Sequence, residues 1–357
     1  MICPHCEKSL LRKERPGNVC GKCGRRYALD PKTNPLKLND LRVRRVVLKL
    51  GQDGQVPCTP GQLWYALSRK TLRDTRVELG CALALTLFGV FFGMIGLGSH
   101  AAAVTVGAGL LLLAAIGFVV AELAGVGRGK PLLGREAFRT GPLQEWRSVY
   151  GALPEGVVDD RSYPATATPD QASTPTNSRP APSTSAPSPD GIVLVCPDRS
   201  IAVFLDAAGL TTRYGVTLVA KPADVTAAPA QGPVLVLHDV DAPGLLLAGR
   251  VRTAHPERRV VDIGLPLVAV QGVARAVPVR GEVPKVRDME LLEESGELSA
   301  AQLKWLGKGW GFPLVGVPPA KLLAVVSRAV ERARATDDPV RRRAASVGFL
   351  TWPEEGR

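Results

Sequence analysis

The chain has 357 residues, enough for two or three structural units, and its seven cysteines lack the pattern of a disulfide framework. The formal charge of +12 is uneven, because residues 1–78 hold 17 Lys and Arg against 7 Asp and Glu. Such a basic segment suits nucleic acid or an anionic membrane surface, and a solvated basic flank that sets membrane orientation fits at least as well. No secretory signal opens the chain.

Two Cys-x-x-Cys pairs near the N-terminus have the spacing of a metal site. They are separated by thirteen residues and consist of Cys3, Cys6, Cys20 and Cys23. Four thiolates complete the closed tetrahedral coordination of a structural Zn²⁺, and Gly21 and Gly24 permit tight turns around it. We expect His5 to lie beside the metal without coordinating it. A redox Cys-x-x-Cys pair is the alternative, which the doubled motif disfavours.

Over about the first 30 residues this pattern resembles the zinc ribbon family, with the four cysteines at the family's ligand positions. The resemblance implies a small β-structured module in residues 1–30. Zinc ribbons bind DNA, RNA or protein, so a nucleic-acid or protein partner is implied without a choice between them. With four protein ligands and no open position, we expect no catalysis at this metal.

Residues 31–78 read as a basic juxtamembrane segment. Residues 41–50 suit either a strand or an amphipathic helix. Thr59 as N-cap and Pro60 in the first turn predict a helix that carries Trp64 and Tyr65. Aromatic residues beside basic ones can stack on bases, but we favour a role as anchors at a membrane interface.

The longest apolar run is residues 79–121, which contain no Asp, Glu, Lys or Arg. A bilayer crossing takes roughly 20 apolar residues, so the run predicts a transmembrane helical hairpin, 79–98 and 101–121. Basic residues flank both ends, which places both termini in the cytoplasm. We therefore expect an integral membrane protein of the inner or plasma membrane, bacterial in type, with the lipid bilayer as a partner. A buried hairpin in a soluble protein is the alternative.

The next segments differ in composition. Residues 122–158 form a second juxtamembrane segment, in which 142–150 predict a short helix carrying Trp146, lying on the membrane surface. Residues 159–190 are mostly Pro, Ser, Thr and Ala, which predicts a disordered linker. An α/β domain follows at 191–335, and a basic tail at 336–357.

In residues 191–335, apolar runs alternate with helical patterns. The runs at 191–196, 216–220, 233–238 and 259–263 predict buried strands. Their alternation with helices predicts a Rossmann-like parallel sheet. The fold class is therefore multidomain: a small β zinc ribbon, a transmembrane hairpin and an α/β unit. Ligands bind outside the carboxyl ends of such strands, where Asp198, Asp239 and Asp241 are expected.

The sequence His238-Asp239-Val240-Asp241 resembles the acidic motif of Toprim domains, over roughly residues 191–265. The resemblance implies that Asp239 and Asp241 bind Mg²⁺ for phosphoryl-transfer chemistry on nucleic acid. The family has a catalytic glutamate after its first strand, and this chain departs from that pattern with the shorter Asp198. On the residues alone, Asp198 and Asp241 are equally explained as helix caps, and Asp239 as a loop carboxylate.

Three functions follow from these patterns. The first is a non-enzymatic membrane protein that presents the ribbon and the α/β domain to the cytoplasm for binding or scaffolding. The second is a magnesium-dependent, Toprim-like domain, active or decayed. The third is a ligand-sensing regulatory domain, although neither a Walker loop nor a GxGxxG motif occurs. No small-molecule substrate can be identified.

Overall fold

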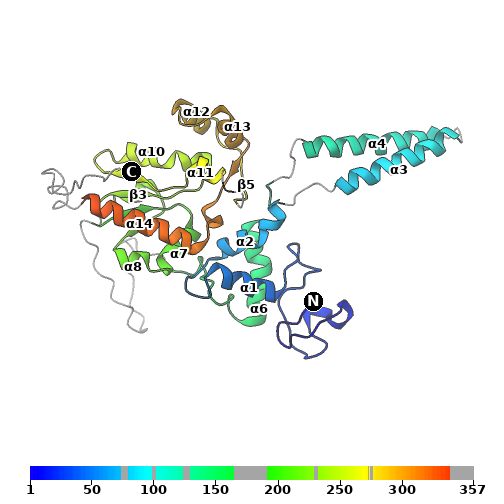
Figure 1. Ribbon diagram of the computed structural model, residues 1–357, viewed down its shortest axis with the longest axis horizontal. Coiled ribbons are helices and arrows are strands. Elements are labelled where there is room, and N and C mark those ends of the chain that lie inside the picture. Colours follow the sequence, from blue (N-terminus) through cyan, green and yellow to red (C-terminus); the bar gives the residue numbers. More distant parts are fainter. Residues whose placement is uncertain are drawn as a thin grey trace, which may run out of the picture. The chain divides into compact units, whose positions relative to one another are not determined.

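The computed structural model describes residues 1–73, 79–98, 102–123, 129–164, 191–228, 232–271, 273 and 276–337 (Figure 1). The chain divides into two compact units. One consists of Met1–Ser68 with Leu133–Arg357, and the other is Arg69–Leu132.

A four-stranded parallel sheet with the strand order β2-β1-β3-β4 forms the centre of the first unit. Its strands are β1 (Val193–Val195), β2 (Thr217–Val219), β3 (Val234–Val236) and β4 (Val260–Asp262). The register pairs Leu194 with Leu218 on one side and with Leu235 on the other. The predicted parallel sheet is confirmed.

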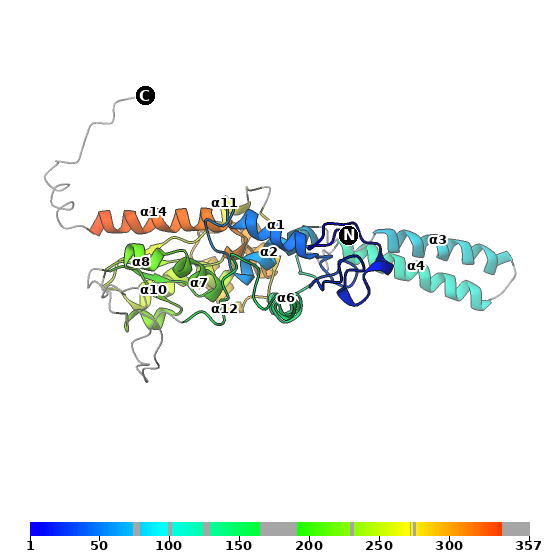
Figure 2. The ribbon, with the colours of Figure 1, turned by 90° about the horizontal axis from the view of Figure 1, so that it is seen from below.

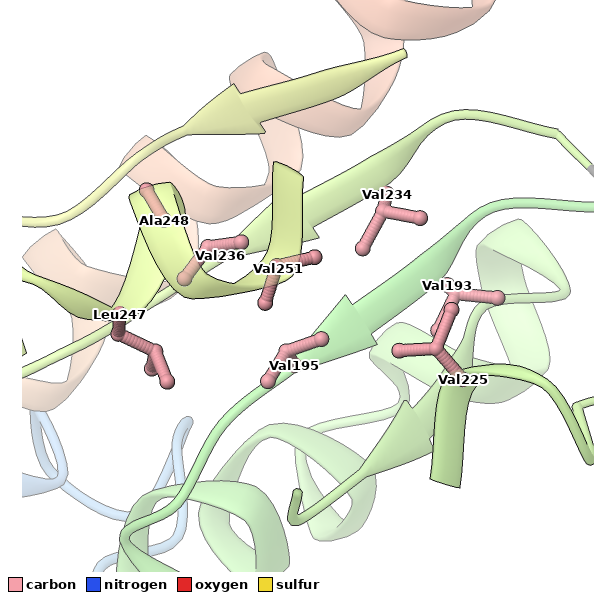
Figure 3. Close-up of a cluster of buried hydrophobic side chains, with 8 residues drawn as sticks. All are labelled: Val193, Val195, Val225, Val234, Val236, Leu247, Ala248 and Val251. Atoms are coloured by element: carbon pink, nitrogen blue, oxygen red, sulfur yellow. The ribbon is translucent and has the colours of Figure 1, made fainter. Parts of the chain in front are cut away.

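Helices cover both faces of this sheet (Figures 1 and 2). One face carries α7 (Arg199–Ala207), α8 (Leu210–Tyr214) and α14 (Pro319–Asp337), and the other carries α10 (Leu247–Ala254). The single turn α9 (Ala242–Leu245) precedes α10 and packs against the segment after β4. In Figure 3 the valines of β1 and β3 meet Leu247, Ala248 and Val251 of α10. Every residue of β1 and β3 is buried, which explains their uninterrupted apolar sequence.

A smaller subdomain follows β4. It contains α11 (Leu267–Gln271), α12 (Val286–Glu294), α13 (Ala300–Gly307) and an antiparallel pair, β5 (Val279–Arg280) with β6 (Trp310–Gly311). A bridge between Val240 and Phe312 joins this subdomain to the end of β3.

The segments before and after the apolar run belong to the same unit as the sheet. They form α1 (Asp40–Leu50), α2 (Pro60–Arg73), α5 (Arg135–Phe138), a π-helical turn (Arg139–Leu143) and α6 (Gln144–Tyr150). Residues 41–50 are thus helical, and α2 begins at Pro60 as predicted.

The interpretation of the tryptophans as membrane anchors is wrong. Trp64 and Tyr65 are each only 6 % exposed, and Trp146 only 3 %. Trp64 Nε1 donates to the carbonyl of Leu133 at 2.7 Å, and the Tyr65 hydroxyl donates to the carbonyl of Val277 at 2.6 Å. These rings are buried because segments distant in sequence cover them.

The second unit contains two helices, α3 (Leu79–Gly98) and α4 (Ala102–Leu123). They pack closely at Gly89, where an added Cβ would lie 2.9 Å from Leu112 Cγ. Nevertheless, within the described residues no helix is both long and apolar enough to cross a membrane. The predicted transmembrane hairpin is contradicted, and with it the integral-membrane function and localisation.

Part of the predicted linker is described. Asp160 is only 2 % exposed, and its carbonyl accepts a hydrogen bond from Arg199 Nε at 2.7 Å. Residues 165–190 and 338–357 lie outside the described residues, so the disordered linker and the basic tail stay predictions, as do the domain boundaries.

Candidate metal centre and strand-edge cavity

Two turns of the same form bring the four predicted cysteines together. The carbonyl of Cys3 accepts from the N–H of Glu7 at 3.1 Å, and that of Cys20 accepts from Gly24 at 2.8 Å. Glu7 and Gly24 both have left-handed backbones, with φ of 57° and 71°. Glycine adopts that conformation freely, so only the second turn has the residue that suits it. An antiparallel bridge closes each turn, joining Ile2 to Ser9 and Val19 to Arg26.

The sulfur positions fit a tetrahedral metal ion. The Sγ atoms of Cys3 and Cys23 are 3.9 Å apart, as are those of Cys6 and Cys20. All four lie within 4.8 Å of one another. Zn–S bonds of about 2.3 Å give a tetrahedron with edges of about 3.8 Å. The predicted four-cysteine cluster is confirmed, and it has the size of a zinc site.

The thiol pKa values in the cluster are shifted in opposite directions. Burial opposes ionisation of Cys20, but the backbone N–H of Lys22 and further hydrogen bonds lower its pKa to about 7. The backbone N–H of Arg25 favours ionisation of Cys23, yet burial and the neighbouring thiols raise its pKa to about 11. Thiolates crowded in this way repel one another until a cation is bound.

Two other predictions concern residues beside the cluster. His5 Nε2 lies 2.8 Å from the carbonyl oxygen of Arg26, so the ring bonds to the backbone, and His5 is not among the clustered ligand atoms. Gly21 allows the backbone of Glu14 to pass close by, because a Cβ at Gly21 would lie 2.8 Å from the Glu14 carbonyl oxygen. Gly21 does not adopt a left-handed conformation.

A buried carboxylate, absent from the sequence predictions, connects the cysteine-containing segment to the helices. Asp40 is 0 % exposed and accepts from the N–H groups of Ala28 and Leu29, at 2.9 and 2.8 Å. It also accepts from the hydroxyl of Tyr150 on α6. Burial, followed by this hydrogen bond, raises the pKa of Tyr150. In the sequence, Asp40 looks like an ordinary first-turn acid, and its partner lies far along the chain.

At the other end of the unit, the strand order creates a crevice. β1 lies between β2 and β3, so the connections from β1 and β2 run in opposite directions across the sheet. Ligands of such sheets bind outside the carboxyl ends at this switch point. A cavity of about 610 Å³ there is bordered by Arg135, Asp239 and Asp241. A neighbouring one of about 230 Å³ touches all three predicted aspartates.

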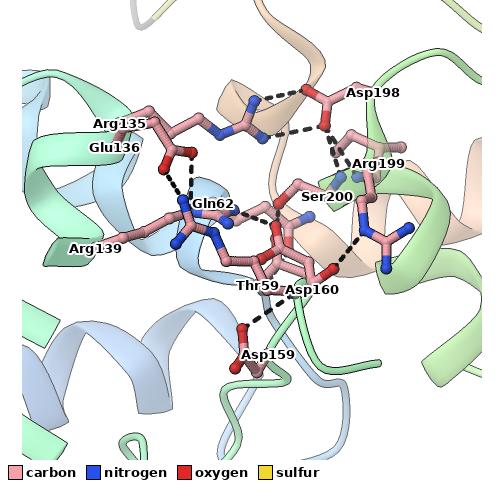
Figure 4. A network of polar contacts seen from close by, with 12 residues as sticks. Thr59, Gln62, Arg135, Glu136, Arg139, Asp159, Asp160, Asp198, Arg199 and Ser200 are labelled. Atoms are coloured by element: carbon pink, nitrogen blue, oxygen red, sulfur yellow. Dashed lines mark hydrogen bonds and ion pairs between the residues drawn. The ribbon is translucent and has the colours of Figure 1, made fainter. Parts of the chain in front are cut away.

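Asp198 is committed to structural contacts. Its carboxylate caps α7 through the N–H groups of Ser200 and Ile201. It also accepts two hydrogen bonds from Arg135, at 3.0 and 3.1 Å (Figure 4). The same network joins the hydroxyls of Ser200 and Thr59 at 2.7 Å, which connects α7 to the start of α2. The capping alternative therefore describes Asp198 correctly.

Asp241 and Asp239 differ in their surroundings. Asp241 caps α9 by accepting from the N–H of Gly244 at 2.8 Å, as the capping alternative predicted. Asp239 accepts from the N–H of Leu314 at 2.7 Å. Burial, and then the charge of Asp198, raise the pKa of Asp239 to about 7. Among the described residues only the four cysteines form a group of three or more clustered metal-ligating atoms, so the three aspartates are not preassembled for a metal.

His238 is a further residue at this edge whose setting the sequence does not reveal. It is 3 % exposed; its Nδ1 lies 2.7 Å from the Asp239 carbonyl oxygen and its Nε2 3.1 Å from an Asp262 oxygen. Burial lowers the pKa of His238, but the bond to Asp262 outweighs it and raises the value. The ring thus links the ends of β3 and β4.

No family model matches this chain, and no match was found among curated proteins or solved structures. Neither the Toprim resemblance nor a bacterial origin gains support from these comparisons.

Proposed function

We propose that this chain is a zinc-binding protein in which one structural Zn²⁺, held by Cys3, Cys6, Cys20 and Cys23, keeps residues 1–30 folded. The observation that carries the proposal is the set of four Sγ atoms within 4.8 Å of one another. The ion is assigned as zinc because four thiolates in a tetrahedron are a ligand set that Zn²⁺ prefers.

The metal is structural and not catalytic. All four positions are filled by protein sulfur, and Cys3 and Cys20 are fully buried. Residues 1–30 contain short 3-10 turns and isolated bridges, with a hydrophobic cluster made of Leu10 and the cysteines themselves. So small a core cannot offset the entropy of ordering the segment, and metal ligation supplies the difference.

Metal content of the purified chain tests this proposal. The wild-type protein should contain one zinc per chain, and Cys20→Ser should lose it. Cys58→Ala is the matched control, because Cys58 is buried outside the cluster, and burial raises its pKa to about 12. A wild-type chain without zinc, or equal zinc loss in both variants, would refute the proposal.

The strand edge supports a second candidate, a Mg²⁺ site at Asp239 and Asp241. The observation in its favour is the cavity of about 230 Å³ whose lining includes Asp198, Asp239 and Asp241. Burial, and then the charge of Asp198, raise the pKa of Asp239, and a bound cation would relieve this cost of ionisation. Oxygen ligands suit this hard cation, and waters would complete its coordination.

Cation binding at this edge should depend on pH. Since Mg²⁺ competes with the proton on Asp239, affinity should rise between pH 6 and pH 8. Calorimetric titration with MgCl₂ should detect binding in the wild type and none in an Asp239→Asn/Asp241→Asn variant. Binding that is unchanged in this variant would exclude these two carboxylates as ligands.

A further inference from the structure

A basic cavity lies beside the cysteine cluster, outside both sites above. Its volume is about 440 Å³, and its lining includes Arg12, Arg15, Asn18, Asp30, Lys32 and Thr33. We call it the ribbon cavity.

The charge of the ribbon cavity is positive because its carboxylate is already paired. Asp30 forms an ion pair with Arg15 and also accepts from the backbone N–H of Lys32 at 2.8 Å. Arg12 and Lys32 are exposed, and neither side chain has an ion-pair partner within the described part of the chain. Two uncompensated cations therefore face a cavity of ligand size.

Arg15 adds a buried donor to this wall. Its side chain is only 5 % exposed, and its Nε has no hydrogen-bond partner among the described residues. Leaving a buried guanidinium N–H without an acceptor costs more free energy than leaving a buried neutral donor without one. Arg15 therefore brings a third cationic side chain to the lining of the cavity. The expected ligand is therefore a compact anion with several acceptor oxygens, such as a phosphate group.

The surrounding surface favours a polymer of phosphates. Residues 1–50 contain thirteen Lys and Arg against four Asp and Glu. All thirteen basic residues except Arg15 and Arg42 are exposed. Of the four acidic residues, only Glu7 is exposed. Basic charge spread over such a surface matches the regular charge of a nucleic-acid backbone.

We propose that residues 1–50 bind nucleic acid through its backbone, with the ribbon cavity receiving one phosphate. Tyr27 is the only aromatic residue among Phe, Trp and Tyr in this segment, and it is fully buried, so base stacking is unavailable. Binding is therefore independent of base sequence and strongly dependent on salt. The inference rests on the zinc-folded ribbon proposed above.

Fluorescence anisotropy with a labelled 20-base-pair DNA duplex of mixed sequence tests the proposal on the full chain. The key variant is Arg12→Ala/Lys32→Ala, and the control is Arg328→Ala/Arg332→Ala, which removes the same charge from exposed positions on α14, outside residues 1–50. At 100 mM KCl the cavity variant should weaken binding at least tenfold and the control less than threefold. The cavity variant should also lower the slope of log affinity against log salt by about 2.

Zinc content measured on the same samples separates the two proposals. A zinc-loaded wild type that binds no duplex overturns this inference alone, and so does binding only to vesicles with 25 % phosphatidylserine. Equal losses in the two double variants also overturn it, since they would mean diffuse attraction without a phosphate subsite. A wild type without zinc overturns both proposals.

Discussion

Protonation of a single carboxyl, Asp239, makes the stability of the α/β unit depend on pH. Its pKa in the folded protein is about 7, whereas an unfolded aspartate titrates near 3.9. Between these values the folded state binds more protons than the unfolded state. The free energy of unfolding therefore falls as pH rises through this window, and the loss is complete above the folded pKa.

Asp239→Asn should remove this pH dependence. Asparagine keeps an oxygen that accepts from the N–H of Leu314, and it places no charge near Asp198. We expect the variant to be more stable than wild type by about 3–4 kcal/mol at pH 8 and by no more than about 1 kcal/mol at pH 4.5.

Urea unfolding at the two pH values measures the difference. The control is Asp53→Asn, a substitution of an exposed turn carboxylate with positive φ, which asparagine also adopts. If Asp239→Asn were less stable than wild type at pH 8, the attraction between the charges of Asp239 and Arg135 would outweigh the burial penalty.

Among the helices, α2 depends on a glycine that makes room for a neighbour. A Cβ on Gly61 would overlap the Arg135 guanidinium and lie 2.7 Å from Ser200 Oγ. The glycine in the first turn of α2 therefore allows Arg135 to reach Asp198. In the sequence, Gly61 is simply a residue that weakens a helix. The reason for a glycine there becomes clear only from the positions of Arg135 and Ser200.

Gly61→Ala should destabilise the protein by about 1–2 kcal/mol, although alanine is the better helix former by about 1 kcal/mol. The reason is that the Arg135–Asp198 contact must shift. Gly249→Ala in α10 is the matched control, since its added Cβ would meet nothing within 4 Å. This substitution should stabilise the protein, because alanine favours the helix. Thermal unfolding compares the two, and stabilisation by both would show that Arg135 moves without cost.

At the scale of the whole molecule, local pattern predicted the elements well. The apolar runs located all four strands of the parallel sheet, the cysteine spacing located the cluster, and Pro60 located the start of α2. These signals are local: a buried strand and a metal knuckle each reveal themselves within a few residues.

Tertiary contacts between distant segments could not be predicted from local sequence patterns. Trp64 bonds to Leu133 and Tyr65 to Val277, so their burial depends on partners 69 and 212 residues away. The same holds for Asp40 and Tyr150, which are 110 residues apart. The position of Trp64 and Tyr65 just before the long apolar run suggested membrane anchors, because the sequence shows which residues are neighbours along the chain but not what covers them.

Asp40 joins the cysteine-containing segment to α6, so its loss should affect more than one element. Asp40→Asn keeps one acceptor oxygen for two backbone N–H groups and the Tyr150 hydroxyl, and we expect a loss of about 2–3 kcal/mol. Tyr150→Phe should cost only about 1 kcal/mol, and the two effects should not add. Urea unfolding of the single and double variants measures this coupling, and full additivity would contradict it.

The most direct measurement is the zinc K-edge X-ray absorption spectrum of the purified full chain. Four cysteine ligands predict a first shell of four sulfur atoms at about 2.3 Å and no nitrogen or oxygen. A shell with fewer than four sulfurs, a shell with nitrogen or oxygen ligands, or a chain that carries no zinc would contradict the assignment of Cys3, Cys6, Cys20 and Cys23 as one metal site.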